Sequence, residues 1–165
     1  MAIGQNAVGA DFESATASAT FELGTMMMGQ GGKFYVYVQA NGAITGDGYV
    51  VAITSAFQAT MIDTDVAATI LQGTKVGVAD CAFADDEYGW VQVYGPCGIR
   101  SEQDAAANAK LYATADAGQV DDALAFGLFI NGMHFGTATG GADAVNTTGR
   151  LNWPTIEVQM EPETA

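Results

Sequence analysis

Side chains of two kinds alternate along several short runs of this chain, and this spacing restricts it to folds built from strands. Phe34, Val36 and Val38 fall on one face of an extended segment. Tyr35 and Tyr37 fall on the opposite face. A repeat of two residues is typical of a β-strand, whereas an amphipathic helix repeats every 3.6 residues. Because both faces carry large apolar or aromatic side chains, each face of this strand requires a covering layer.

Similar runs, bounded by Gly, Asn and Asp, follow along the rest of the chain. They predict further strands at residues 49–54, 75–83, 88–94, 124–130, 133–135 and 151–160. Turn-forming residues at 41–48 suggest that 49–54 returns beside the first strand, and 75–83 and 88–94 are expected to form a hairpin. Pro154 lacks a backbone N–H, which favours an edge position for the last strand.

Asn131-Gly132 lies between two apolar runs and predicts a hairpin with a type I′ turn, in which both central residues have positive φ. Helix signals are few. Ser101-Glu102-Gln103-Asp104 resembles a capping box and predicts a short helix at 102–109, and 63–71 could hold one more turn. The 165 residues are therefore expected to form an all-β fold: a single-domain β-sandwich or β-barrel of short antiparallel strands, with at most one or two short helices.

Residues 1–31 differ from the rest of the chain, since they are rich in Ala, Ser, Thr and Gly and show no strong periodicity. We interpret them as an extended N-terminal arm that contributes few core residues, attached to a single β domain at 32–165. Such an arm would dock on its own domain or on a neighbouring chain. The alternative is a first edge strand at residues 20–28.

The charge of the chain excludes several classes of partner. It has 19 acidic and 5 basic residues, for a net charge of −14. So few basic residues cannot form the positive surface that nucleic acids and anionic membranes require. No apolar run reaches the length of a membrane span, and the first residues lack the features of a signal peptide. We therefore expect a protein made in the cytoplasm, with neither nucleic acid nor membrane as its partner.

Few residues could support catalysis. His134 is the only histidine, it is expected within a strand, and the chain lacks a Gly-x-Ser-x-Gly motif. Cys81 and Cys97 are expected to be thiols, with a disulfide as the alternative. The three carboxylates at 85–87 lack the spacing of a calcium loop and are expected at a solvated hairpin tip. We therefore expect no enzymatic activity, no cofactor and no metal site.

Several segments together resemble a family of viral structural proteins. They include Phe-Glu-Leu-Gly-Thr at 21–25, Gly-Lys-Phe-Tyr-Val-Tyr-Val-Gln-Ala-Asn-Gly at 32–42 and Tyr-Gly-Trp-Val-Gln-Val-Tyr-Gly at 88–95. Over residues 21–135 the chain resembles the small proteins of tailed bacteriophages that are encoded near the major capsid protein, many of them capsid decoration, or cement, proteins. The resemblance implies a β-rich fold without catalytic residues. It also implies a trimer on the outside of the phage head, with an arm that clamps neighbouring capsid subunits.

On this basis the expected function is that of a virion protein that binds the major capsid protein and stabilises the shell against the pressure of the packed DNA. An acidic exterior suits this role, because it keeps particles apart. The expected capsid or oligomer interface consists of the apolar residues of the arm and of two aromatic strand faces: Phe21, Leu23, Met26, Met27, Met28, Tyr35, Tyr37, Trp90 and Tyr94.

Two other functions fit the same residues. One is a phage tail or fibre component that contacts a host receptor. The other is a carbohydrate-binding β-sandwich module, because Trp90 and Tyr94 share one face of a predicted strand and Tyr88 and Trp153 are further aromatic candidates. A core or an interface between subunits is the favoured interpretation of that aromatic face.

Overall fold

The structure is a computed structural model that describes residues 9–69, 72–123, 129–141 and 144–157. The fold is all-β, as predicted. Its described elements are one short helix, one 3₁₀ turn and ten strands, which belong to one hydrogen-bonded sheet. In chain order they are β1 (Met26–Met28), η1 (Gln30–Gly32), β2 (Phe34–Ala40), β3 (Val50–Ile53), β4 (Gln58–Met61), α1 (Thr64–Thr69), β5 (Lys75–Ala79), β6 (Tyr88–Ser101), β7 (Leu111–Ala113), β8 (Val120–Asp121), β9 (Phe129–Phe135) and β10 (Val145–Glu157).

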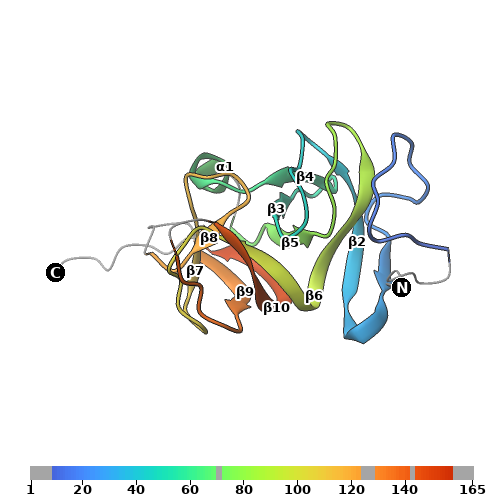
Figure 1. Cartoon of the computed structure of the whole chain (residues 1–165). Helices are drawn as coiled ribbons and strands as arrows, with labels where there is room; N and C mark the ends of the chain where they lie inside the picture. Colours follow the sequence, from blue (N-terminus) through green and yellow to red (C-terminus); the bar gives the residue numbers. More distant parts are fainter. Residues whose placement is uncertain (1–8, 70–71, 124–128, 142–143, 158–165) are drawn as a thin grey trace.

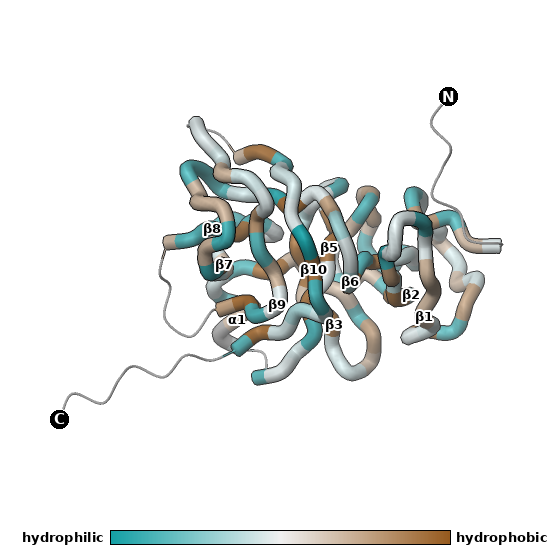
Figure 2. The backbone as a smooth tube through the Cα atoms, turned by 90° about the horizontal axis from the view of Figure 1, so that it is seen from below, coloured by the Kyte–Doolittle hydropathy of each residue, from teal (hydrophilic) through white to brown (hydrophobic). Residues whose placement is uncertain are grey.

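The strands pair in two closed circuits that share β6. In the first circuit, the pairing runs from β2 through β4, β3, β5 and β6 back to β2. In the second, it runs from β6 through β8, β7, β9 and β10 back to β6. Two separate clusters of buried apolar side chains accompany the circuits: one lies within the first circuit, and the other joins the second circuit to Val50, Val76 and Val78 of β3 and β5. In both views β2 lies at one end of the molecule and β7 and β8 lie at the other (Figures 1 and 2).

The 14 residues of β6 pass from one circuit to the other. Its first half pairs with β2 and β5, and its second half pairs with β10. Alternation holds along this strand: Val91 and Val93 belong to the core of the first circuit, while Trp90 faces the other side. The predicted hairpin of 75–83 with 88–94 is confirmed, since β5 and β6 pair antiparallel.

Two predictions about strand pairing are wrong. The segment 49–54 does form a strand, but β3 pairs with β4 and β5 instead of returning beside β2. β3 is an interior strand with a partner on each edge, and all four of its residues are buried. Beside β2 the structure instead places β4, in a parallel pair, so the sheet is not purely antiparallel.

The hairpin predicted at Asn131-Gly132 is also wrong, because β9 runs straight through these two residues. Gly132 does have a positive φ of 78°, but the cause is a bulge in the neighbouring strand. Between Leu151 and Thr155 the register of β10 shifts against β9, and a Cβ on Gly132 would lie 2.7 Å from the carbonyl oxygen of Asn152. Residues 124–128 of the predicted hairpin lie outside the described residues.

The last strand is central, not at an edge as Pro154 suggested. β10 pairs with β5, β6 and β9, and it begins at residue 145, six residues before the predicted start of the last strand at 151. Pro154 falls within the bulge, where the ladder is interrupted, so its missing N–H leaves no ladder partner unsatisfied.

One of the two predicted helical segments is confirmed. α1 forms within 63–71, and Asp63 caps it by accepting a hydrogen bond from the backbone N–H of Val66 at 2.7 Å. The helix predicted at 102–109 is wrong, since Asp104 and Asn108 have positive φ and Ala105 instead exchanges hydrogen bonds with Thr139. Tertiary hydrogen bonds replace the helical ones in this segment.

The described part of the arm lies on its own domain, across the outer face of β2 and β6. Phe12 is fully buried and stacks on Tyr35, with ring centroids 4.1 Å apart. Phe21 packs edge-on against Tyr37 and Trp90. Only residues 26–28 of the predicted edge-strand segment form a strand, β1. The arm contributes two buried apolar residues, Ala10 and Phe12, which join Tyr35, Tyr37 and Trp90 in a third buried core that we call the arm cluster.

Candidate docking surface

No group of three or more His, Cys, Asp or Glu side chains among the described residues could hold a metal ion. Cys81 and Cys97 are both free thiols, as expected. Burial is the main cause that raises the pKa of Cys81 to about 11 and that of Cys97 to about 12, so both remain protonated and unreactive at neutral pH.

The acidic residues at 85–87 form the expected hairpin tip. Asp85 accepts a hydrogen bond from the backbone N–H of Gly42 at 2.7 Å, and Glu87 accepts one from the backbone N–H of Ala84 at 2.7 Å. These carboxylates thus hold two neighbouring loops in place. Their position at an exposed turn agrees with the structural role predicted for them.

Most of the residues expected at an interface lie in the arm cluster. Tyr35, Tyr37 and Trp90 are 0%, 1% and 2% exposed, because the chain's own arm covers them. Their placement on an accessible interface is therefore wrong. The partly buried residues Phe21, Leu23 and Met27 pack against the same cluster.

The other expected residues, Met26, Met28 and Tyr94, lie on a different surface. The exposed large apolar side chains among the described residues are Met26 at 50%, Met28 at 63%, Trp153 at 46% and Val145 at 38%. The first three gather in one place, which we call the Met–Trp surface and define by Met26, Met28, Phe34, Tyr94 and Trp153. Met26 lines a cavity together with Trp153, and Met28 pairs with Phe34 across the strands β1 and β2.

Three aromatic rings form the middle of the Met–Trp surface. The ring centroid of Trp153 lies 5.6 Å from that of Phe34 and 5.7 Å from that of Tyr94. Phe34 and Tyr94 meet edge-on at 5.8 Å. Each ring thus holds the other two in a fixed orientation, and such contacts contribute about 0.5–1.5 kcal/mol per pair beyond simple burial. The surface is therefore ordered before any partner binds.

The bulge in β10 presents Trp153 at this surface. Trp153 has a φ of 52°, in the left-handed region that large side chains rarely adopt. It lies opposite Gly132, where β10 holds extra residues between Leu151 and Thr155. Without the bulge, the pleat would continue unbroken through this position. A backbone held in a costly conformation that exposes a large aromatic side chain is typical of functional sites.

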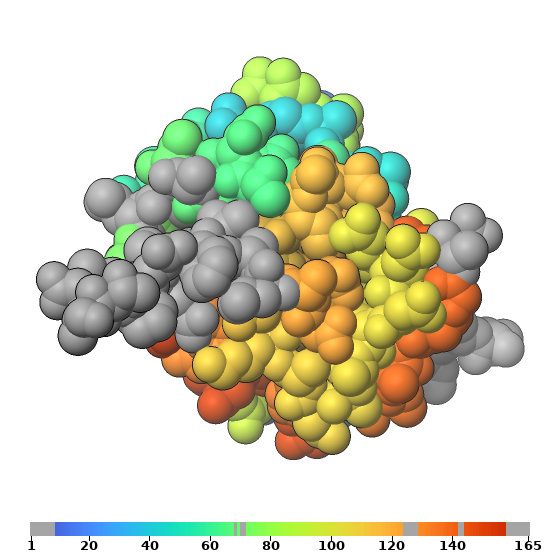
Figure 3. All heavy atoms as spheres, turned by 90° about the vertical axis from the view of Figure 1, so that its left-hand side faces the viewer, coloured from blue at the N-terminus to red at the C-terminus, as the bar shows by residue number. Residues whose placement is uncertain are grey.

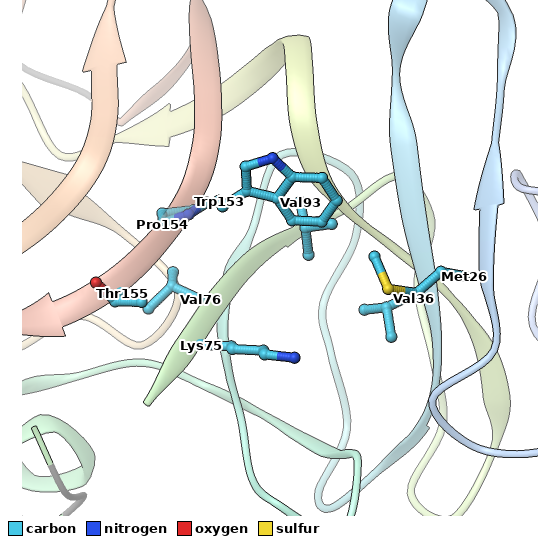
Figure 4. Close-up of a pocket in the computed structure, with 8 residues that line it drawn as sticks. All are labelled: Met26, Val36, Lys75, Val76, Val93, Trp153, Pro154 and Thr155. Atoms are coloured by element: carbon cyan, nitrogen blue, oxygen red, sulfur yellow. The ribbon is translucent and has the colours of Figure 1, made fainter. Parts of the chain in front are cut away.

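A cavity of about 140 Å³ lies beside Trp153 (Figure 4). Its walls come from the two sides of the junction between the circuits: Met26, Val36, Lys75, Val76, Val93, Trp153, Pro154 and Thr155. Figure 4 shows the Trp153 indole above the opening, Lys75 below it and the thioether of Met26 across from β10. All but two of the lining residues are apolar, so the cavity favours an apolar occupant.

Charge is distributed unevenly around this surface. Lys75 is the one charged residue that lines the cavity, and its ammonium group lies 5.9 Å from the ring centroid of Phe57. At the end of the molecule formed by β7, β8 and β9 (Figure 3), carboxylates repel one another: burial and then the charges of Asp121 and Asp116 raise the pKa of Glu102. The cavity therefore has a local positive charge on an otherwise acidic protein.

Sequence reasoning missed Phe34, Lys75 and Trp153 as members of this site. Trp153 was noted only as an aromatic candidate for sugar binding. No local pattern in the sequence indicates that Trp153 of β10 lies near Met26 of β1, since the two strands lie near opposite ends of the chain. The one usable signal is the neighbouring Pro154, which interrupts an otherwise regular strand pattern and marks an irregularity in β10.

Comparison with known proteins returns no match: no family model, no curated protein and no solved structure is significantly similar to this chain. Among the described residues, no helix is long and apolar enough to cross a membrane.

Proposed function

We propose that this protein is a decoration protein of a tailed-bacteriophage capsid, made in the host cytoplasm and carried on the outside of the head. It binds the major capsid protein as an oligomer, with a trimer as the expected form, and stabilises the shell against the pressure of the packed DNA. The resemblance over residues 21–135 supports this proposal. So do the all-β fold and the acidic composition, with a net charge of −14.

The observation that carries the proposal is the gathering of exposed apolar side chains at the Met–Trp surface. Three of the four exposed large apolar residues that the structure describes, Met26, Met28 and Trp153, belong to it. Contiguous exposed apolar residues on a soluble protein mark interaction sites, and Trp and Met are typical of the anchors in such sites. β1 adds a strand edge, because among the described strands it is terminal in the sheet and pairs with β2 alone.

The arm has a different role from the one expected from the resemblance. Residues 9–25 cover Tyr35, Tyr37 and Trp90 of their own domain, so they stabilise the protein itself. We therefore assign contact with the shell to the Met–Trp surface and not to this part of the arm.

The alternative functions receive less support. The aromatic strip of a carbohydrate-binding module required Trp90 beside Tyr94, but Trp90 is 2% exposed and lies under the arm. A tail or fibre component would use the same apolar surface, so the experiment below compares heads with tails.

Co-sedimentation with purified particles tests the proposal. Heads and tails of the phage, each lacking this protein, are incubated with increasing concentrations of it. We expect saturable binding to heads and none to tails. Binding to tails alone, or to neither particle, would contradict the proposed function.

Variants test the surface within the same experiment. Trp153→Gly removes the indole, and glycine adopts a positive φ without strain, so the bulge is retained. Because a buried Trp anchor typically contributes about 2 kcal/mol or more to an interface, we expect a loss in affinity for heads of at least ten-fold. Val145→Ser is the matched control, since it removes the exposed apolar side chain that lies elsewhere, and it should bind as the parent does. Equal binding by the two variants would exclude the Met–Trp surface as the docking site.

A further inference from the structure

The cavity beside Trp153 has the size of a single side chain. Its volume is about 140 Å³. An apolar cavity of about 150 Å³ in a protein stays dry and binds benzene. A phenyl ring therefore fits, whereas a sugar ring would find few polar partners and a lipid chain would be too long.

The walls favour an aromatic ring over an aliphatic side chain. Trp153 offers an indole ring, and the thioether of Met26 faces the same opening (Figure 4). Sulfur–aromatic contacts and ring–ring contacts are both favourable, and a methionine side chain adapts its shape to the ring it meets. Pro154 lies next to Trp153, across the cavity from Met26, and its fixed φ keeps that wall rigid.

Lys75 adds a charge requirement to the shape requirement. It lies at the edge of the cavity, where its alkyl stem forms part of the wall and its ammonium group reaches solvent. The cavity has no acidic residue in its lining, although the chain has 19 acidic residues in total. A carboxylate next to an inserted ring would therefore find an attractive partner here, whereas an ammonium group would be repelled.

We propose that the cavity is a socket for one aromatic side chain of the partner protein, with a carboxylate from the adjacent partner residue paired to Lys75. This inference rests on the proposed function, because it takes the partner to be the shell protein. The socket would be occupied by an extended segment of that protein in which Phe, Tyr or Trp stands next to Asp or Glu.

Three capped dipeptides test the socket on the full-length protein: N-acetyl-Phe-Glu-amide, N-acetyl-Phe-Gln-amide and N-acetyl-Phe-Lys-amide. The chain has two tryptophans, so its NMR spectrum has two indole N–H signals. Trp153 reports on the cavity, and the buried Trp90 serves as an internal control. We expect saturable shifts of the Trp153 signal only, with dissociation constants on the order of 1 mM for such small ligands.

The affinities should follow the charge of the second residue. An exposed ion pair changes affinity by roughly two- to five-fold, so we expect the Glu peptide to bind most tightly and the Lys peptide least tightly. Because the Debye length is about 3 Å in 1 M salt, the three affinities should converge there. This salt dependence tests the role of Lys75 without any variant.

In Lys75→Gln the three dipeptides should bind with equal affinity, because the aromatic ring still enters the cavity but the charge of Lys75 is gone. Lys110→Gln is the matched control, since the ammonium group of Lys110 also lies over a phenylalanine, 5.3 Å from the ring centroid of Phe129, but Lys110 does not line the cavity. That variant should keep the parent ranking. An unchanged Trp90 signal in both variants shows that the fold is intact.

Three results would overturn the socket: no saturable shift of Trp153, equal affinity for the three peptides at low salt, or a ranking that survives in Lys75→Gln. A Trp153 signal that moves on dilution of the protein alone would assign the cavity to a second copy of the chain, which also contradicts the proposal. Peptide binding without binding to phage heads would retain the socket and refute the proposed function. Binding to heads without peptide binding would refute the socket and retain the proposed function.

Discussion

Both faces of β2 carry aromatic side chains, yet the arm buries those on one face completely, whereas Phe34 on the other face opens onto a partly exposed surface. On one face, Tyr35 and Tyr37 are buried beneath Phe12 of the arm. On the other face, Phe34 belongs to the Met–Trp surface, where Trp153 remains 46% exposed. The difference is the arm: it covers the aromatic side chains of one face, whereas on the other face Val36 and Val38 lie in the core of the first circuit and only Phe34 reaches the Met–Trp surface. Aromatic content alone therefore does not identify an interface, and what matters is whether the same chain covers the aromatic residues.

The strongest test of this comparison removes the central contact of the covered face. Phe12→Ala should lower the free energy of unfolding by about 3–5 kcal/mol, the usual cost of deleting a fully buried phenylalanine. Urea denaturation measures the change. Trp153→Gly should cost about 1–2 kcal/mol in the same assay, because it removes two ring contacts, while the half-exposed indole and the relief of backbone strain limit the loss. An equal loss of unfolding free energy in the two variants would mean that the arm-covered residues stabilise the fold no more than the exposed ones do.

The next test disturbs the Met–Trp surface through its support in β9. Gly132→Val places a branched side chain at a φ of 78° and against the carbonyl oxygen of Asn152. We expect a loss of roughly 1–3 kcal/mol in stability from strain at this residue. The NMR signal of the Trp153 indole should shift while that of Trp90 remains in place. A shift of both signals would indicate that the two faces are coupled through the fold.

A third test uses a partly buried acid, Asp80, that contacts the covered face. The Tyr35 hydroxyl donates a hydrogen bond of 2.9 Å to Asp80. Burial is the main cause that raises the pKa of Asp80, with smaller contributions from Glu13 and Asp47, while the Tyr35 hydrogen bond and Lys33 act in the opposite direction. A raised pKa means that the folded state holds this proton more tightly than the unfolded state does. The resulting stabilisation is complete below the unfolded value of about 4 and is lost as pH rises through the folded value.

Asp80→Asn removes this titration and retains an oxygen that accepts the Tyr35 hydrogen bond. Denaturation at a series of pH values should therefore give a flatter profile for the variant than for the parent. The variant should gain stability relative to the parent as pH rises above 4. A parallel pair of profiles would show that Asp80 does not titrate differently in the folded state.

The smallest effects are expected at two neighbouring methionines on opposite faces of β1. Met28 is 63% exposed, so Met28→Ser should change the free energy of unfolding by less than about 0.5 kcal/mol. Met27 packs against the arm cluster, and Met27→Ser should cost about 1–2 kcal/mol. Thermal unfolding of the two variants would show whether the two faces of the edge strand β1 already differ in their contribution to stability.

Local patterns predicted the strands well and their neighbours poorly. Alternation located β2 and β3 to within two residues, and turn signals identified the β5–β6 hairpin. The partners of β2 depend on closure of a circuit through β4 and β6, which no local pattern encodes. Positive φ at Gly132 was predicted correctly but for the wrong reason, since a bulge in β10 and not a turn requires it. Long-range contacts decide these features.

The candidate site was predicted in part for the same reason. Met26, Met28 and Tyr94 were expected at an interface from their apolar character, and the structure places all three on the Met–Trp surface. Trp90 was expected there too, but the arm covers it. Whether an apolar strand residue is covered depends on where a distant segment lies. The sequence alone therefore could not separate the predicted interface residues that are exposed from those that the arm buries.

The sharing of β6 between two circuits has a mechanical consequence. A pull on the Met–Trp surface enters the molecule through β2, β6 and β10, and β6 is hydrogen-bonded into both cores. The load is thus spread along an antiparallel ladder that must shear as a unit instead of opening one bond at a time. Neither core can yield while the other holds, since each would lose a wall. A single chain stretched from its two ends should therefore rupture its two circuits in one step.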